Sequence, residues 1–324
     1  MNVAVSPPRP RRRLPGWLTL TVRIVATGAL LAFALRDVKW PALLRDLKAA
    51  DWRWLAAGLL LSVGVQVIAG VRWAALARPL GFDFPVSLFV RRFFEGGFFS
   101  LCLPSSIGGD VVKAYRLGDT TQRRLLAGCS VLADRLTGVS ALGVLAGTAL
   151  VTQKYGLTTA GAITTAVGLL AAVLAGFWIG VSSIDKVMAV MPSPHPVRAF
   201  LAQLLPYQQR PWLIARAVGW SFVVQIGGTL AVALLARSLR IDLPLAAWFA
   251  VAPLVALVET LPISIGGFGL RENAMEILLA GHGVPSEQAI ATALLCGLAR
   301  IVAGLVGGVF FLLDRAASPL PVAD

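Results

Sequence analysis

The chain has 324 residues, of which 57% are hydrophobic and only 14% are charged. Soluble domains carry about 25% charged residues, so this composition excludes an ordinary soluble protein and indicates a polytopic membrane protein. The net charge of +13 comes from Lys and Arg at the edges of apolar segments. That placement is typical of positive-inside membrane loops, and we expect no nucleic-acid partner.

The chain begins with a basic tail, followed by an apolar segment at 17–35. This segment is long enough to cross a membrane and predicts a first membrane helix. A cleavable signal peptide is the alternative, because Ala32-Phe33-Ala34 resembles a cleavage site. In residues 36–53, apolar and charged residues alternate with a helical period, which predicts an amphipathic helix at the membrane interface.

Further apolar segments predict helices at 54–77, 86–103, 125–151, 157–181, 213–236, 245–262 and 286–313. The predicted organisation is a tail (1–16), a first membrane helix with the interfacial helix (17–53), a first repeat (54–181), a polar connection (182–212), a second repeat (213–315) and a tail (316–324). The three cysteines lie in apolar surroundings and have no CxxC spacing, so neither a disulfide framework nor a metal site is predicted. No cofactor is expected.

The sequence contains an internal duplication. Residues 103–110 read "LPSSIGGD" and residues 261–268 read "LPISIGGF". The segments "LARPLGFDFP" (76–85) and "LARSLRIDLP" (235–244) also match. Three pairs of polar residues fall at matching positions, namely Gln66 and Gln225, Lys113 and Arg271, and Arg135 and Arg300. A shared order of polar, proline and glycine residues is difficult to obtain by chance in apolar sequence.

Two topologies can be compared by the distribution of Lys and Arg. If 86–103 and 245–262 enter the membrane and return on the same side, more of these residues lie inside than if every segment spans. We therefore predict an all-α polytopic membrane protein with about six full spans and two broken, re-entrant segments, in which the second repeat is inverted. The basic residues of 36–53 then lie outside, which is the one conflict with the positive-inside rule.

The repeated element predicts a polar site. Proline ends a helix, and two glycines allow a sharp turn with accessible amides, from which a further helix can start. Such amides bind anions, and nearby serine hydroxyls add donors. Matching broken segments in two halves of a membrane protein point to a transporter's binding site. The predicted residues are Ser105, Ser106, Gly108, Gly109, Ser264, Gly266 and Gly267. The alternative is a pair of ordinary loops.

Charged residues within or beside the apolar segments support this site, because a charge near mid-bilayer costs at least about 2.5–3.5 kcal/mol. We expect a lipid headgroup to be bound by Lys113, Arg135, Arg271 and Arg300, with Arg135 and Arg300 as the leading phosphate contacts. Acidic residues that could couple transport or form ion pairs are Glu95, Asp110, Asp134, Glu259 and Glu272. The alternative is that these charges only fix helix packing.

The segments "LPSSIGGDVVKAYRL", "ADRLTG" and "LPISIGGFGLRE" together resemble the lysylphosphatidylglycerol synthase transmembrane (flippase-like) family. The resemblance covers roughly residues 15–315 and implies a membrane domain that moves lipids across the bilayer. In the best-known members this domain precedes a soluble synthase domain. Because the chain ends soon after its last predicted helix, we expect a standalone member without that domain.

Three classes of function follow. The first is translocation of a polar lipid, such as a phospholipid or glycolipid, with membrane lipids as the partners. The second is a non-transporting partner of a separate lipid-modifying enzyme, and the third is a membrane-embedded enzyme acting on lipid phosphates. Because the charged residues include no histidine or set of metal ligands, we expect the chain not to be an enzyme. The expected location is a bacterial inner membrane.

Overall fold

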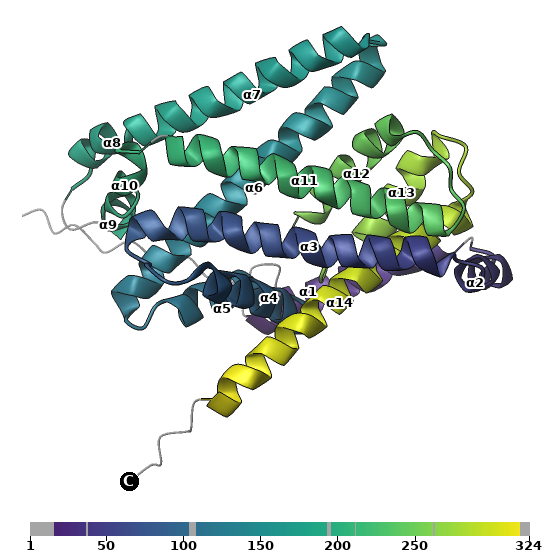
Figure 1. The fold of residues 1–324 in the computed structure, drawn as a ribbon, viewed down its shortest axis with the longest axis horizontal. Coiled ribbons are helices and arrows are strands. Elements are labelled where there is room, and N and C mark those ends of the chain that lie inside the picture. Colours follow the sequence, from purple (N-terminus) through teal and green to yellow (C-terminus); the bar gives the residue numbers. More distant parts are fainter. Residues whose placement is uncertain are drawn as a thin grey trace, which may run out of the picture.

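The computed structural model describes residues 16–36, 38–103, 108–192, 196–210, 212–261 and 263–317, and these residues form helices and connections without a strand. The helices are α1 (Gly16–Leu35), α2 (Trp40–Lys48), α3 (Trp52–Ala77), the short 3₁₀ helix η1 (Arg78–Leu80), α4 (Val86–Cys102), α5 (Gly108–Leu117), α6 (Thr121–Tyr155), α7 (Thr159–Ser182), α8 (Ile184–Val190), α9 (Pro196–Ala202), α10 (Leu205–Gln208), α11 (Trp212–Ser238), α12 (Leu245–Glu259), α13 (Leu270–Ala280) and α14 (Ser286–Ala317). Figure 1 shows their arrangement.

The predicted all-α polytopic membrane fold is confirmed. Within the described residues, five helical segments are long and apolar enough to cross a membrane, and they contain α3, α6, α7, α11 and α14. Two further stretches are apolar but shorter, namely 24–35 within α1 and the whole of α12. The predicted interfacial helix is α2, and the polar connection contains the short helices α8, α9 and α10.

The helices begin where the sequence supplies a cap. Asp51 accepts a hydrogen bond from Arg53 N–H at the start of α3, and Thr120 accepts one from Arg123 N–H at the start of α6. Pro85 and Pro244 precede α4 and α12 with nearly the same backbone angles, at φ −61° with ψ 146° and 147°. The chain therefore enters α4 in the first half and α12 in the second half in the same way.

The two halves have opposite orientations. α3 and α11 pack against each other in antiparallel directions (Figure 1). Near one end, Asp51 N–H donates to the Ser238 carbonyl at 2.8 Å, and near the other, Arg72 Nη1 donates to Ser221 Oγ at 2.9 Å. Because α3 and α11 are equivalent elements of the duplication, the repeat is inverted about an axis perpendicular to these helices.

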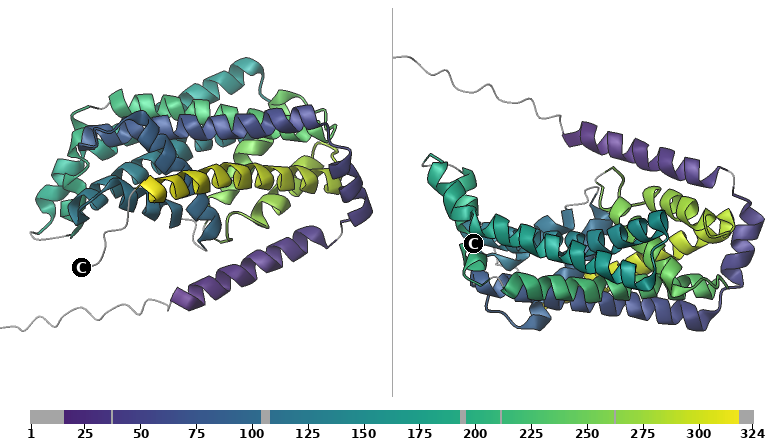
Figure 2. Two further views of the ribbon diagram at one scale, coloured as in Figure 1. Left: turned by 60° about the horizontal axis from the view of Figure 1, so that its bottom comes forward. Right: turned by 90° about the horizontal axis from the view of Figure 1, so that it is seen from above.

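Each half packs its broken segment on a long helix of the other half. α4 lies against α14, and α12 lies against α6 (Figure 2). Within each half the order of neighbours is also repeated, because α4 packs on α5 as α12 packs on α13, and α5 packs on α6 as α13 packs on α14. This reciprocal packing places both repeated elements in the middle of one bundle.

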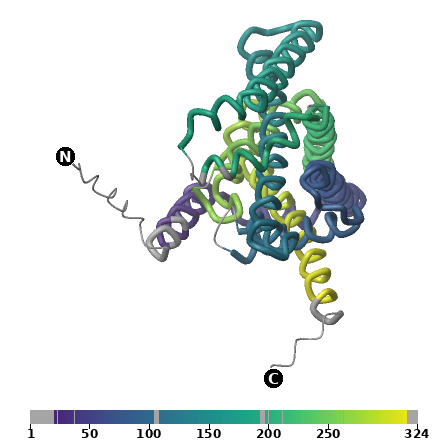
Figure 3. The backbone as a smooth tube through the Cα atoms, turned by 90° about the vertical axis from the view of Figure 1, so that its left-hand side faces the viewer, coloured from purple at the N-terminus to yellow at the C-terminus, as the bar shows by residue number. Residues whose placement is uncertain are grey.

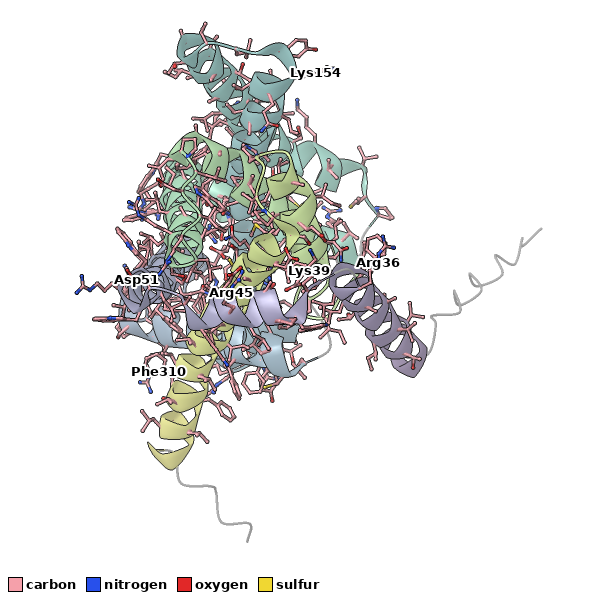
Figure 4. The ribbon with its side chains drawn as sticks, turned by 90° about the vertical axis from the view of Figure 1, so that its right-hand side faces the viewer. Arg36, Lys39, Arg45, Asp51, Lys154 and Phe310 are labelled. Atoms are coloured by element: carbon pink, nitrogen blue, oxygen red, sulfur yellow. The ribbon has the colours of Figure 1, made fainter. Side chains whose placement is uncertain are left out.

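Two parts lie at the periphery of the bundle. α2 crosses one end of the bundle, where Lys39 and Arg45 mark it in Figure 4, and it buries Leu43 against the core. The hairpin of α6 and α7 projects from the rest of the molecule (Figure 3), and α7 has no buried residue. α14 is the last described helix, so α7 has no counterpart within the described second half.

Candidate functional site

Two adjoining cavities lie between the helices of the two halves. The first-half cavity, of about 350 Å³, includes Lys113 and Arg135 in its lining. The second-half cavity, of about 330 Å³, includes Arg271 and Arg300. Residues that line both cavities are Gln66, Leu142, Val224, Gln225, Arg300 and Ala303. The four predicted basic residues therefore border two adjoining cavities.

The two cavities are built from equivalent positions of the repeat. Lys113 in the first-half cavity corresponds to Arg271 in the second-half cavity, and Arg135 corresponds to Arg300. Other matched lining pairs are Ala69 and Gly228, Arg72 and Ala231, Phe93 and Ala252, Gly97 and Ala256, Ser100 and Glu259, and Asp134 and Ala299. Each cavity is thus lined by one matched pair of basic residues, and the first-half cavity is also bordered by Arg72 and Arg300.

Gln66 and Gln225 lie where the two copies meet. They occupy equivalent positions on the antiparallel helices α3 and α11, and both line both cavities. Gln225 Nε2 donates to the Gly138 carbonyl at 3.3 Å. An uncharged amide side chain can both donate and accept hydrogen bonds, so this pair places neutral polar groups where the two cavities adjoin.

In the first-half cavity, one carboxylate joins both cations. Asp110 lies 2.7 Å from Lys113 Nζ and accepts a hydrogen bond from Arg135 Nε at 2.6 Å. The Lys113 ammonium also lies over the Phe93 ring, 4.5 Å from its centroid. Lys113 and Asp110 are largely buried, whereas the Arg135 side chain is 49% exposed. The more accessible cation is therefore the arginine.

The second-half cavity repeats this arrangement with a different carboxylate. Glu259 Oε2 forms a short ion pair with Arg300 Nη2, and Glu259 Oε1 lies 3.7 Å from Arg271 Nη1. Arg300 Nη1 also donates to the Gly266 carbonyl at 2.9 Å. On its other side, Arg271 Nη2 donates to Glu272 at 2.6 Å. Arg271 is almost completely buried, and Arg300 is the accessible member of the pair.

Some buried polar atoms of the second-half element have no hydrogen-bond partner among the described residues. They are Glu259 Oε1, Arg271 Nη1 and Ser264 Oγ. Leaving a buried donor or acceptor unpaired costs about 1–3 kcal/mol, and more for charged groups. Glu259 and Arg271 both line the second-half cavity, and their two unbonded atoms lie 3.7 Å apart, so they face each other as an ion pair without a hydrogen bond.

A second buried ion pair borders the first-half cavity. Arg72 donates to both carboxylate oxygens of Asp134, at 2.7 and 2.9 Å, and to Ser221 at 2.9 Å. The equivalent positions in the other half are Ala231 and Ala299, so the pair occurs only once. Sequence reasoning missed Arg72, which lies near the end of an apolar segment and resembles a flanking charge.

Glu95 lies away from both cavities. It pairs with Arg92 at 2.9 Å and Arg116 at 3.1 Å. Asp314, from the end of α14, joins the same network through Arg91, Arg92 and Arg116. Of the two roles expected for Glu95, this network provides an ion pair, which fixes the end of α14 against α4 and α5.

The glycines of the first repeated element serve close packing. α5 begins at Gly108, and a side chain at Gly109 would meet the Gly96 carbonyl oxygen at 2.1 Å. Both glycines are buried, so they allow α5 to approach α4 closely. This packing role is one that the sequence pattern does not predict. Ser105 and Ser106 lie outside the described residues.

The glycines of the second element form the predicted sharp turn. Gly266 and Gly267 have φ angles of +62° and +79°, a left-handed conformation that favours glycine. α13 begins at Leu270, later than Gly267, and Glu272 accepts a hydrogen bond from Gly269 N–H at 2.6 Å. Glu272 is therefore used as a helix cap and as a partner of Arg271.

The fold and the cavities define an integral membrane protein built from an inverted repeat with broken helices around a polar centre. The family model for the lysylphosphatidylglycerol synthase TM region matches residues 20–308, and the chain therefore belongs to this family. A comparison with curated proteins found no match. Membership places the chain among membrane domains that occur in a lipid-related context.

Proposed function

We propose that the chain translocates a polar lipid, a phospholipid or a glycolipid, across the membrane. The observation that carries this proposal is the pair of adjoining cavities, each lined by one matched pair of basic residues and both lined by Gln66 and Gln225. A lipid phosphate is a suitable ligand for such cations, and Arg135 and Arg300 can bind it bidentately. The acyl tails would stay in the bilayer while the headgroup passes through the cavities.

The inverted repeat supports this function mechanistically. In transporters of this type, two halves of opposite orientation expose a central site alternately to the two sides of the membrane. Here each half contributes one cavity, so one headgroup position would belong to each leaflet. No histidine lines either cavity within the described residues, which favours transport over acid–base catalysis. The location we propose is a bacterial inner membrane.

Lipid movement in liposomes tests the proposal. The purified chain would be reconstituted with fluorescent phosphatidylglycerol, phosphatidylethanolamine or a fluorescent glycolipid, and the outer leaflet would be quenched by a membrane-impermeant reductant. We expect the wild type to make the inner-leaflet lipid accessible. Arg135→Ala and Arg300→Ala should each slow this movement at least about tenfold, because each removes a charge-assisted contact worth about 1.5–3 kcal/mol.

Arg216→Ala is the matched control, because Arg216 is an exposed arginine of α11 that does not line either cavity. It should move lipid at the wild-type rate. Lipid movement that is equally fast in all four proteins would reject the cavities as the path. A wild type that moves none of the lipids would favour the non-transporting partner of a lipid-modifying enzyme.

A further inference from the structure

Both cation pairs are already occupied by an anion of the chain itself. Asp110 binds Lys113 and Arg135 in the first-half cavity, at 2.7 and 2.6 Å. Glu259 binds Arg300 and lies 3.7 Å from Arg271 in the second-half cavity. In each case a single carboxylate lies between the two basic side chains where a bound phosphate would have to contact them.

These carboxylates do not derive from one duplicated residue. The position equivalent to Asp110 in the second half is Phe268, and the position equivalent to Glu259 in the first half is Ser100. Asp110 lies on α5, after the break, whereas Glu259 is the last residue of α12, before it. The basic residues occupy equivalent positions of the repeat, whereas the carboxylates that lie between them come from different elements.

A carboxylate is a close substitute for a phosphate oxygen pair. Both accept bidentate hydrogen bonds from arginine and carry negative charge. In each pair one cation, Lys113 or Arg271, is almost fully buried, and a buried charge is costly unless a partner offsets its desolvation. A resident carboxylate lowers this cost in the empty protein, and for Arg271 the neighbouring Glu272 lowers it too. An arriving phosphate must displace it, which lowers the net affinity and favours release.

We propose that Asp110 and Glu259 are displaceable counter-ions. Each occupies an anion position in the empty protein, turns away when a phosphate-bearing headgroup enters, and returns when the headgroup leaves. Glu259 Oε1 and Arg271 Nη1, 3.7 Å apart, form an ion pair without a hydrogen bond, which is a looser contact than the two that Asp110 makes. This inference rests on the proposed function, because it assigns the ligand of the same cavities as a phosphate monoanion.

The test is equilibrium binding to the full-length chain in detergent, measured by calorimetry. The probes are dihexanoyl phosphatidylglycerol, inorganic phosphate and the uncharged dihexanoylglycerol. We expect Asp110→Asn and Glu259→Gln to bind dihexanoyl phosphatidylglycerol about tenfold more tightly than the wild type, which corresponds to about 1.4 kcal/mol. If Asp110 and Glu259 instead contacted the headgroup directly, the same substitutions would weaken binding, because each would remove a contact.

Three controls make the result specific. Asp110→Glu and Glu259→Asp keep the charge and should retain an affinity much closer to that of the wild type. Asp314→Asn removes a carboxylate from a separate ion network and should not tighten binding, so tightening there would indicate a general effect of net charge. Dihexanoylglycerol should bind equally to all variants. Unchanged or weaker phosphatidylglycerol binding by folded Asp110→Asn and Glu259→Gln overturns the proposal.

The outcomes separate this inference from the proposed function. Tighter lipid binding without lipid movement by the wild type would support the counter-ions and reject translocation. Lipid movement by the wild type without tighter binding by the variants would support translocation and reject the counter-ions. Tightening for inorganic phosphate but not for dihexanoyl phosphatidylglycerol would overturn the lipid assignment and identify a site for a free anion.

Discussion

Among the individual residues, Arg72 and Asp134 form a deeply buried charge pair in which both partners line the first-half cavity. Removing one partner leaves the other charge buried without compensation, which costs about 3–5 kcal/mol. We expect Asp134→Ala to lower the free energy of unfolding by this amount, measured by denaturant titration in detergent. Arg72→Ala combined with Asp134→Ala should cost less than the sum of the single changes.

Arg135, which is adjacent to Asp134 in the sequence, is the control for this stability measurement. Arg135 is half exposed, and exposed ion pairs contribute about 0–1 kcal/mol. Arg135→Ala should therefore change stability little while it slows lipid movement. A stability loss from Arg135→Ala as large as that from Asp134→Ala would contradict the different burial of these neighbours.

Sequence reasoning identifies single residues best where a charge interrupts an apolar segment. Arg135 and Arg300 interrupt apolar segments, Lys113 and Arg271 follow the two breaks, and all four line the cavities. The partner of a charge is not predictable from the same pattern. Glu259 and Asp110 hold the same kind of cation pair from different elements, so the repeat alone does not reveal their shared role.

At the level of elements, the contact between α4 and α5 depends on a glycine. A Cβ at Gly109 would lie 2.1 Å from both the Gly96 carbonyl and Ser100 Oγ, so the two helices would have to separate. We expect Gly109→Ala to destabilise the protein by about 1–3 kcal/mol, the usual cost of overpacking. A thermal unfolding measurement in detergent checks this value.

Gly97→Ala is the comparison, because Gly97 lies in α4 and a Cβ there meets nothing within 4 Å. Alanine stabilises a helix interior by about 0.5–1 kcal/mol relative to glycine, so Gly97→Ala should be neutral or stabilising. Equal losses for both substitutions would show that close packing of α4 and α5 is not the reason for the glycine.

Hydropathy predicts the long helices because a span needs a continuous apolar segment. The predicted segment 213–236 agrees closely with α11 (Trp212–Ser238). Hydropathy does not predict how a broken segment uses its glycines. The same Gly-Gly pair packs α5 against α4 in one half and forms a left-handed turn in the other. The residues packed around each Gly-Gly pair determine which role it has, and the sequence pattern does not identify those residues.

For the whole molecule, the inverted repeat predicts that equivalent turns face opposite sides of the membrane. The turn between α5 and α6 and the turn between α13 and α14 lie at opposite ends of the bundle (Figure 1). Asp119 and Ala280 are exposed beside these turns. In a variant without native cysteines, we expect Asp119→Cys and Ala280→Cys to react with a membrane-impermeant maleimide from opposite sides of sealed vesicles.

Labelling of both positions from the same side would reject the inverted arrangement. Val190→Cys, in the connection after α7, reports the side reached by α7 and serves as a reference; Val190 is highly exposed. The duplication and its orientation were predictable because matched polar residues and the Lys and Arg distribution are both properties of the sequence. The reciprocal packing of α4 on α14 and α12 on α6 was not, because it joins segments from different halves.

The antiparallel contact of α3 with α11 also bears on how the duplicated chain evolved. A half-length ancestor could make this contact only as a homodimer whose two copies were inserted in opposite orientations. Such an ancestor needs similar numbers of Lys and Arg on both sides, because a charge bias fixes a single orientation. Fusion of the copies removed that requirement. Two cavities that began as identical by symmetry could then acquire different residues, as Asp110 and Glu259 now show.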